Sequence, residues 1–242
     1  LKEPRSAASR AEARDAALLA DPAAPLPQSV WAAIGEAFSS RAFTWLFIAA
    51  SVTAFLSYGK GLWTISFFIR SHGLSTTEAG LSMAVALGAA GILGTWLGGK
   101  LADRFGQQDK RHLLTFPAIG MAVAAPILFT GYVVADWRVA VALLIVPTIL
   151  NAAYYGPAYA CVQGLVRPQL RSVAASMVVF GQNLIGLGAG PLAFGILSDY
   201  LQPLAGAESV RWVLYGAAWL GLIPAFCFWR ASLRLNEEMR AG

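Results

Sequence analysis

Six long apolar runs constrain this chain more than any other feature of its sequence. They cover residues 42–69, 77–102, 112–135, 139–166, 172–201 and 210–233. A helix crosses a bilayer with about 20 apolar residues, whereas a membrane strand needs only about 10. Runs of this length therefore predict helices, which satisfy their own backbone hydrogen bonds in the absence of water. The sequence predicts an all-α membrane protein with a six-helix transmembrane domain over residues 42–234.

Composition excludes the soluble alternatives. Of the 242 residues, 57% are hydrophobic and 13% are charged, against roughly 25% charged in an ordinary soluble domain. Disorder, coiled coil, collagen and a disulfide scaffold do not fit these figures. Both cysteines, Cys161 and Cys227, lie inside apolar runs and are interpreted as small buried residues. No metal site and no cofactor is predicted.

The positions of the basic residues predict the orientation. An even number of spans places both termini on one side, and that side carries 14 of the 18 Lys and Arg residues. Arg70, Arg138 and Arg211 fall on the other side, and Lys60 lies within a span. Because cytoplasmic loops carry the excess of Lys and Arg, we expect both termini to be cytoplasmic, in the plasma (inner) membrane. The net charge of +5 is thus a topology signal, and no nucleic-acid partner is predicted.

The segments outside the spans have different compositions. Residues 1–27 are rich in Ala, Pro and charge and are predicted to be a cytoplasmic linker. Residues 28–41 place Trp31, Ile34 and Phe38 at helical spacing, which predicts an amphipathic helix on the inner surface. Residues 235–242 are predicted to be a cytoplasmic tail. The chain begins with Leu1, so we expect it to be the rear part of a longer protein.

The turn between the second and third runs carries a motif. Its sequence is G-x-L-A-D-R-x-G, formed by Gly99, Leu101, Ala102, Asp103, Arg104 and Gly106. Gly106 is expected to take a positive φ at the end of the turn, and Asp103 to accept bonds from a nearby helix N-terminus. The turn is either an ordinary basic turn or an intracellular gate.

This motif resembles motif A of the major facilitator superfamily. Gln107-Gln108 replaces the basic pair that usually follows it, and the charge is displaced to Lys110 and Arg111. The stretches 3–5, 162–171, 186–191 and 195–199 look like parts of the spinster-like branch, which is associated with lipid-type substrates. The resemblance implies the C-terminal half of a transporter, helices seven to twelve, built as two inverted three-helix repeats. It also implies a missing N-terminal six-helix half as partner.

Polar residues within the spans are candidates for a substrate cavity. Ser57, Lys60 and Thr64 share one helical face. A charge inside a membrane is costly, so a role in binding is expected, with snorkelling to the interface as the alternative. In the superfamily, helices seven, ten and eleven of this half face the central cavity. The full predicted set is Ser57, Tyr58, Lys60, Thr64, Asn151, Tyr155, Gln182 and Asn183.

Each of these polar groups alone has interhelical hydrogen bonding as its alternative role. In the second span, Ala84, Gly88, Gly91, Gly94 and Gly98 are expected to form a close-packing stripe. No Asp or Glu lies in the middle of any span, so no carboxylate proton relay is visible.

The resulting function is secondary active transport of a small organic solute, anionic or lipid-like, by alternating access. The lipid bilayer and the small-molecule substrate complete its predicted partners. The alternatives are a non-transporting scaffold or degenerate half-transporter and, less favoured, an intramembrane enzyme. An enzyme would need a buried nucleophile and base, and no His lies at depth.

Overall fold

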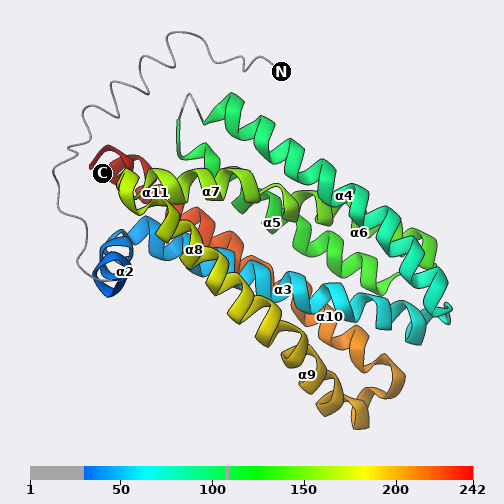
Figure 1. Ribbon diagram of the computed structural model, residues 1–242. Helices are drawn as coiled ribbons and strands as arrows, with labels where there is room; N and C mark the ends of the chain where they lie inside the picture. The colour runs from blue at the N-terminus through cyan, green and yellow to red at the C-terminus, as the bar shows by residue number, and fades with distance from the viewer. Residues whose placement is uncertain (1–29, 107–108, 242) are drawn as a thin grey trace.

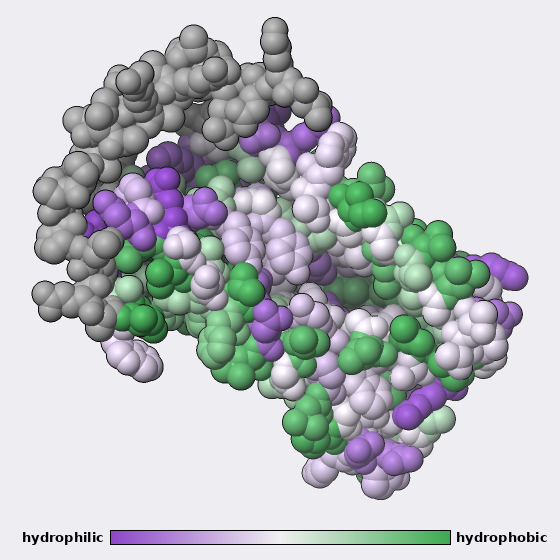
Figure 2. Space-filling model, in the orientation of Figure 1, coloured by the Kyte–Doolittle hydropathy of each residue, from purple (hydrophilic) through white to green (hydrophobic). Residues whose placement is uncertain are grey.

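The computed structural model describes residues 30–106 and 109–241, so the predicted linker over residues 1–27 lies outside the described part of the chain. Within these ranges the chain is helical, with short connecting turns and no strand. The helices form an elongated bundle (Figure 1). Hydrophilic surface gathers mainly toward the two ends of the bundle, and the surface between them is largely hydrophobic (Figure 2).

The helices follow one another closely along the chain. In order they are α2 (Val30–Ser39), α3 (Arg41–His72), α4 (Thr76–Phe105), α5 (His112–Val133), α6 (Trp137–Ala152), α7 (Tyr155–Gly164), the 3-10 turn η1 (Pro168–Leu170), α8 (Arg171–Gly181), the π-helix η2 (Gln182–Ala189), α9 (Gly190–Ala205), the 3-10 turn η3 (Gly206–Glu208), α10 (Ser209–Leu220) and α11 (Leu222–Ala241).

Among the described residues, five continuous helical segments are long and apolar enough to cross a membrane, and the last of them covers Pro168–Met239. That segment reverses direction at Gly206, where φ is 55°. The rod α8–η2–α9 therefore turns back into the rod α10–α11 (Figure 1), and the Ser198 and Ser209 hydroxyls lie 3.0 Å apart across the reversal. Counted as rods, the predicted six spans are confirmed.

Helix ends are satisfied by local side chains. Ser75 and Glu78 form a capping box at the start of α4, with the Glu78 amide donating to Ser75 Oγ over 3.2 Å. Asp136 caps α6 in the same manner, accepting from the Arg138 amide over 2.8 Å. These caps supply partners for amides that have none within their own helix.

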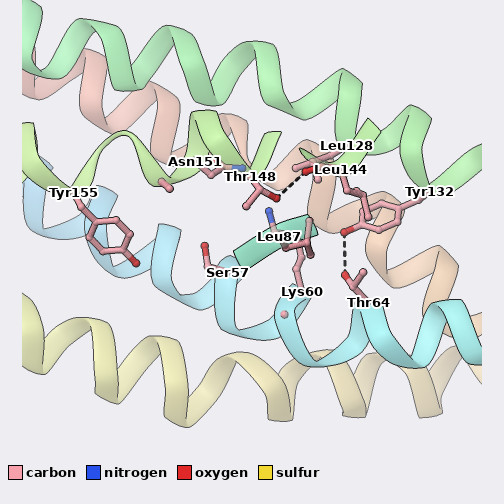
Figure 3. Close-up of a pocket in the computed structure, with 12 residues that line it drawn as sticks. Ser57, Lys60, Thr64, Leu87, Leu128, Tyr132, Leu144, Thr148, Asn151 and Tyr155 are labelled. Carbon is pink, nitrogen blue, oxygen red and sulfur yellow. Dashed lines mark hydrogen bonds between the residues drawn. The ribbon is translucent and has the colours of Figure 1, made fainter. Parts of the chain in front are cut away.

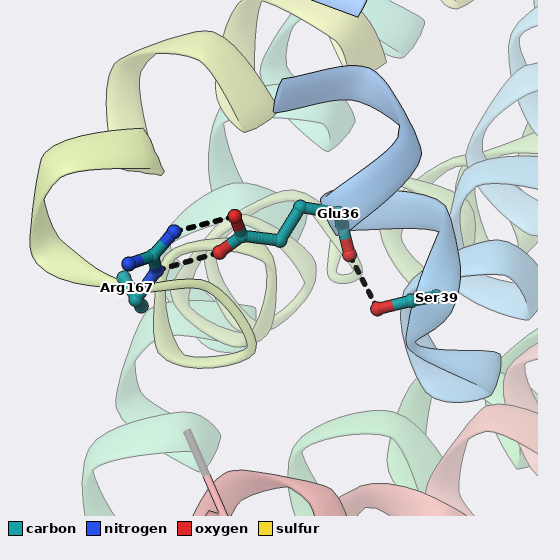
Figure 4. Close-up of polar contacts among 3 residues, drawn as sticks. All are labelled: Glu36, Ser39 and Arg167. Atoms are coloured by element: carbon teal, nitrogen blue, oxygen red, sulfur yellow. Dashed lines mark hydrogen bonds and ion pairs between the residues drawn. The ribbon is translucent and has the colours of Figure 1, made fainter. Parts of the chain in front are cut away.

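The end of the bundle that carries α2 is tied together by acidic side chains. Glu238 on α11 accepts hydrogen bonds from the Ser40 hydroxyl (2.6 Å) and the Ala42 amide (3.1 Å) at the N-terminus of α3. Glu36 on α2 accepts two hydrogen bonds from Arg167, which precedes η1; the Nε donor lies 2.6 Å from Oε1 (Figure 4). This charged partner raises the pKa of Arg167.

The turn between α4 and α5 belongs to the same end. Asp109 accepts from the Arg111 amide (2.9 Å) and from Asn236 of α11 (2.8 Å), and these bonds lower its pKa. Residues 235–241, predicted as a tail, continue α11 as far as Ala241, and Leu235 is fully buried. Both α2 and the C-terminus of α11 thus lie at the same end as this turn.

Helix α3 is the central element. It packs against α11, η2 and α9, while α5 packs against α6, α10 and α11. One buried cluster around Phe43, Leu46 and Phe228 fills the α2 end, and another around Phe67 and Tyr132 fills the opposite end.

The glycine stripe on α4 is a packing surface over only part of its length. A Cβ on Gly98 would overlap the backbone of Ala153, and one on Gly94 would lie 2.8 Å from Ala152 Cβ. Gly88 and Gly91 have open space instead. Close contact is confined to the point where α4 crosses the junction of α6 and α7.

The expected positive φ at Gly106 is wrong. Its φ is −66°, in the right-handed helical region. A Cβ there would lie 2.6 Å from Leu113 Cδ2 and 2.6 Å from the Ala102 carbonyl oxygen. These close contacts, one of them with α5, disfavour a side chain at this position. The φ itself is helical and does not call for glycine.

The crossing of α4 and α7 gives a first prediction. Gly98→Ala should destabilise the protein by about 1–3 kcal/mol, the usual cost of overpacking. Gly91→Ala is the matched control, because it adds the same methyl group to open space in the same helix and favours helix formation. Thermal unfolding of the purified full-length protein measures both. Equal melting temperatures for the two variants would contradict the assigned contact.

Candidate functional site

A cavity of about 220 Å³ lies between α3, α4, α5 and α6 (Figure 3). Figure 2 shows the surface hollowed on this face of the bundle, with hydrophobic residues at the floor of the hollow. Its polar lining residues are Ser57, Lys60, Thr64, Tyr132, Thr148, Asn151 and Tyr155. The rest of the wall is formed by Gly61, Leu87, Leu128, Leu144 and Ala152.

Helical spacing places the polar residues together. Ser57, Lys60 and Thr64 are three and four residues apart on α3, so they share one face. Thr148 and Asn151 are three apart on α6, and Tyr155 begins α7 one turn later. The two faces meet across the cavity. Of the eight predicted residues, the structure brings together Ser57, Lys60, Thr64, Asn151 and Tyr155.

Lys60 is the one cation that lines this cavity. Its side chain runs from α3 toward the helix that carries Thr148 and Asn151 (Figure 3). It also borders a smaller cavity of about 10 Å³ that includes Ser57 and Asn151. Within the described residues its ammonium has no hydrogen bond and no ion pair. This direction favours the cavity-facing interpretation over snorkelling.

Two polar cavity residues were not singled out from the sequence. Tyr132 on α5 shares a 3.2 Å hydrogen bond with Thr64, and the Thr148 hydroxyl donates to the Leu144 carbonyl over 2.7 Å. Thr148 precedes Asn151 by three residues, and that spacing was the signal available in the sequence. Tyr132 gave no comparable signal, because α5 carries no other polar residue on that face near the cavity.

The other three predicted residues lie elsewhere. Gln182 bridges two tyrosines: its Nε2 donates to the Tyr154 hydroxyl (3.0 Å), and its Oε1 accepts from the Tyr159 hydroxyl (2.8 Å). Asn183 is exposed and donates to the Val179 carbonyl of its own helix over 2.9 Å. Tyr58 is 41% exposed and lies beside Gly186 of η2.

The segment η2 is a π-helix in close contact with α3. A Cβ on Gly186 would lie 2.7 Å from Ala54 Cβ, and one on Gly190 would lie 2.6 Å from the Phe55 carbonyl oxygen. Trp63 of α3 donates to the Pro191 carbonyl over 3.0 Å. π-Helical segments are frequent at functional sites.

The motif residues Gly99, Asp103, Arg104 and Gly106 are separate from the Lys60 cavity. Asp103 and Arg104 are exposed at the α2 end, where they border an open depression of about 480 Å³ with Lys100 and Leu101. Gly99 faces Gly156 of α7, and a Cβ added to Gly156 would lie 3.7 Å from the Gly99 Cα. Within the part of the chain that the structure describes, no group of three His, Cys, Asp or Glu residues is arranged to hold a metal ion.

Comparison with known proteins identifies the class. The family model described as Major Facilitator Superfamily matches residues 1–191. A protein of Mycolicibacterium smegmatis named "MFS-type efflux pump" is 35% identical over 196 residues, which are 79% of this chain and 46% of that protein. The chain belongs to the major facilitator superfamily.

Solved structures agree on the fold. A bacterial homologue of the human lysosomal transporter Spinster, in an inward-facing and unoccupied conformation, superposes with a TM-score of 0.77 at 22% identity, covering 90% of this chain and 53% of that chain. The inward-facing, occupied conformation gives a TM-score of 0.71 at 23% identity, covering 81% and 50%. The present chain spans about half the length of these relatives, and its fold is one half of a major facilitator transporter. It is an integral membrane protein.

The Gln182 bridge gives a second prediction. Gln182→Met should destabilise the protein by about 1–3 kcal/mol, because it removes a hydrogen-bond partner from the hydroxyl of the buried Tyr154 and from the hydroxyl of Tyr159. Asn183→Met is the control, since Asn183 is exposed and bonds only within its own helix. Thermal unfolding of the full-length protein measures the difference. Adding Tyr154→Phe to Gln182→Met should recover part of the lost stability. The bridge would be refuted if there were no recovery and if Gln182→Met and Asn183→Met were equally stable.

Proposed function

We propose that this chain is the C-terminal half of a secondary transporter that moves a small anionic or lipid-like organic solute by alternating access. Its partner is an N-terminal six-helix half, and the substrate site lies between the two halves. The names of the relatives, an efflux pump and a homologue of a lysosomal transporter, support a transport role. The binding residues in this half are those around Lys60, together with Tyr58, Gln182 and Asn183, which lie outside this cavity.

The observation that carries this proposal is the position of Lys60. From Lys60 to His72 at the end of α3, the helix rises about 18 Å at 1.5 Å per residue, so the ammonium lies deep in the span. A charge there is costly unless it meets water, a carboxylate or an anionic ligand. The lining of its cavity, as the structure describes it, supplies hydroxyls, an amide and apolar side chains but no carboxylate.

Apolar walls beside one cation suit an amphipathic anion. Leu87, Leu128 and Leu144 line the same cavity as the ammonium. A carboxylate or phosphate would meet Lys60, with Ser57 and Asn151 as hydrogen-bonding neighbours, while an apolar tail would lie against the leucines. The second half would close the remaining side of this site.

We assign the motif turn to gating rather than binding. Asp103 is exposed at one end of the bundle, and it bonds to no described residue, so its partner would be a helix N-terminus of the other half. Such a contact would hold the two halves together in one state. The excess of Lys and Arg at this end supports the proposal that it lies, with α2 and the C-terminus of α11, on the cytoplasmic side of the plasma membrane.

Lys60 gives a prediction that separates charge recognition from apolar contact. In the full-length protein, Lys60→Ala should weaken binding of a dansyl-labelled fatty acid by about 10- to 100-fold, because a hydrogen bond to a charged group contributes about 1.5–3 kcal/mol. The neutral amide of the same probe should bind equally to both proteins, and Lys60→Arg should keep part of the affinity. Dansyl fluorescence titration measures the binding of each probe to each protein.

Arg70→Gln controls for loss of a basic residue outside the cavity, since Arg70 lies at the end of α3 and is exposed. Unchanged binding of the fatty acid to Lys60→Ala would contradict the assigned role.

Asp103→Asn tests the gate. It should lower the turnover of transport in proteoliposomes by at least about tenfold, a loss of about 1.4 kcal/mol, while the affinity for the same probe stays within twofold. Asp199→Asn is the control, because Asp199 is an acidic residue in α9, outside the motif turn. A large loss of affinity with normal turnover would move Asp103 from the gate to the binding site.

A further inference from the structure

A second cavity lies on a different side of α4 and α6. It measures about 230 Å³ and shares no lining residue with the Lys60 cavity. Its wall is apolar along most of its length and includes Leu97, Leu101, Phe116, Ile119, Val123 and Leu150. We refer to these residues and Gly120 as the α4–α5 groove. Nothing in the transport mechanism proposed above uses it.

The groove opens outward along α5. Ile119 is 55% exposed and Val123 is 48% exposed, and both line it. The other sides of α5 pack against α6, α10 and α11. In a bilayer an open apolar channel at this surface is filled by hydrocarbon, because no water is available there.

Positive charge lies at one end of the groove. His112 lines it at the start of α5, and Lys110 and Arg111 directly precede His112 and are exposed. Within the described residues neither of these two side chains has an ion pair or a hydrogen bond. The nearby Asp109 carboxylate accepts hydrogen bonds from Asn236 and from the Arg111 amide, and it also interacts electrostatically with Arg111 and His112.

We propose that the α4–α5 groove binds one anionic phospholipid from the leaflet at the α2 end of the molecule. One acyl chain lies in the groove against Ile119, Val123 and Leu150. The phosphate lies at its basic end, within reach of Lys110, Arg111 and His112. Basic residues at a membrane surface attract anionic lipids by about 1 kcal/mol each, and the apolar channel adds hydrocarbon contact that a surface cluster of charge lacks.

Charge complementarity selects this occupant over a protein segment. An apolar transmembrane helix of the other half would bring no negative charge to Lys110 and Arg111. An anionic phospholipid brings a phosphate for the basic end and hydrocarbon for the apolar groove. The apolar part lies at membrane depth on α4 and α5, and the charged part lies in the turn between them.

Gly120 offers a way to block the groove. A Cβ at this position would lie 3.7 Å from Leu150, an ordinary contact, so the fold accepts the first carbon of a side chain there, and the remaining carbons of a leucine are added at the groove that Gly120 lines. Gly216 on α10 is the matched control, because it is exposed and a Cβ there meets nothing within 4 Å. Gly120→Leu and Gly216→Leu therefore add the same side chain, but only the first fills the site.

The test is native mass spectrometry of the full-length protein titrated with phosphatidylglycerol or phosphatidylcholine. Wild type and Gly216→Leu should retain one phosphatidylglycerol in preference to phosphatidylcholine. Gly120→Leu should bind it at least about tenfold more weakly, and Lys110→Gln/Arg111→Gln should lose the preference for the anionic lipid. Arg138→Gln, an exposed basic residue at the opposite end, should keep it. Unchanged binding to Gly120→Leu, or equal retention of the two lipids by wild type, would overturn the proposal.

Discussion

A bilayer core offers the peptide backbone no hydrogen-bond partner, so each membrane-crossing segment has to satisfy its amides and carbonyls internally. This constraint accounts for the long helices and for the location of polar chemistry at their ends, where Ser75 and Asp136 cap α4 and α6. It also explains why ion pairs gather outside the spans, as at Glu36 and Arg167. Against this background Lys60 stands apart, because its charge lies deep inside a span and points into a cavity.

Helices in lipid gain little from apolar attraction to one another, so close contact depends on small residues. In this chain Gly98 meets the backbone at Ala153, and Gly186 and Gly190 bring η2 and α9 against α3. These contacts position the walls of the Lys60 cavity: α3 is held on one side by η2 and α9, and α4 is held against α6 on the other. The π-helical geometry of η2 and the Trp63 bond to Pro191 lie along the same contact.

Features that depend on local spacing were predictable from the sequence. Run length predicted the spans, and the intervals between Ser57, Lys60 and Thr64 predicted their common face. Long-range partners were not predictable, because they depend on how helices pack. Gln182 meets Tyr154 from 28 residues away, and Glu238 reaches Ser40 across 198 residues. The close approach of Leu113 of α5 to Gly106 likewise depends on packing and was not predicted from the sequence.

The most direct test of the account is the water accessibility of the Lys60 cavity in the full-length protein. Ser57→Cys and Asn151→Cys should react with a charged, membrane-impermeant thiol reagent, whereas Ile223→Cys, on the exposed apolar surface of α11, should not. Background from this half is expected to be low because Cys161 and Cys227 are buried. Protection of Ser57→Cys and Asn151→Cys by an anionic amphiphile is the predicted result. If both cavity cysteines reacted no faster than Ile223→Cys, the result would contradict a substrate cavity around Lys60.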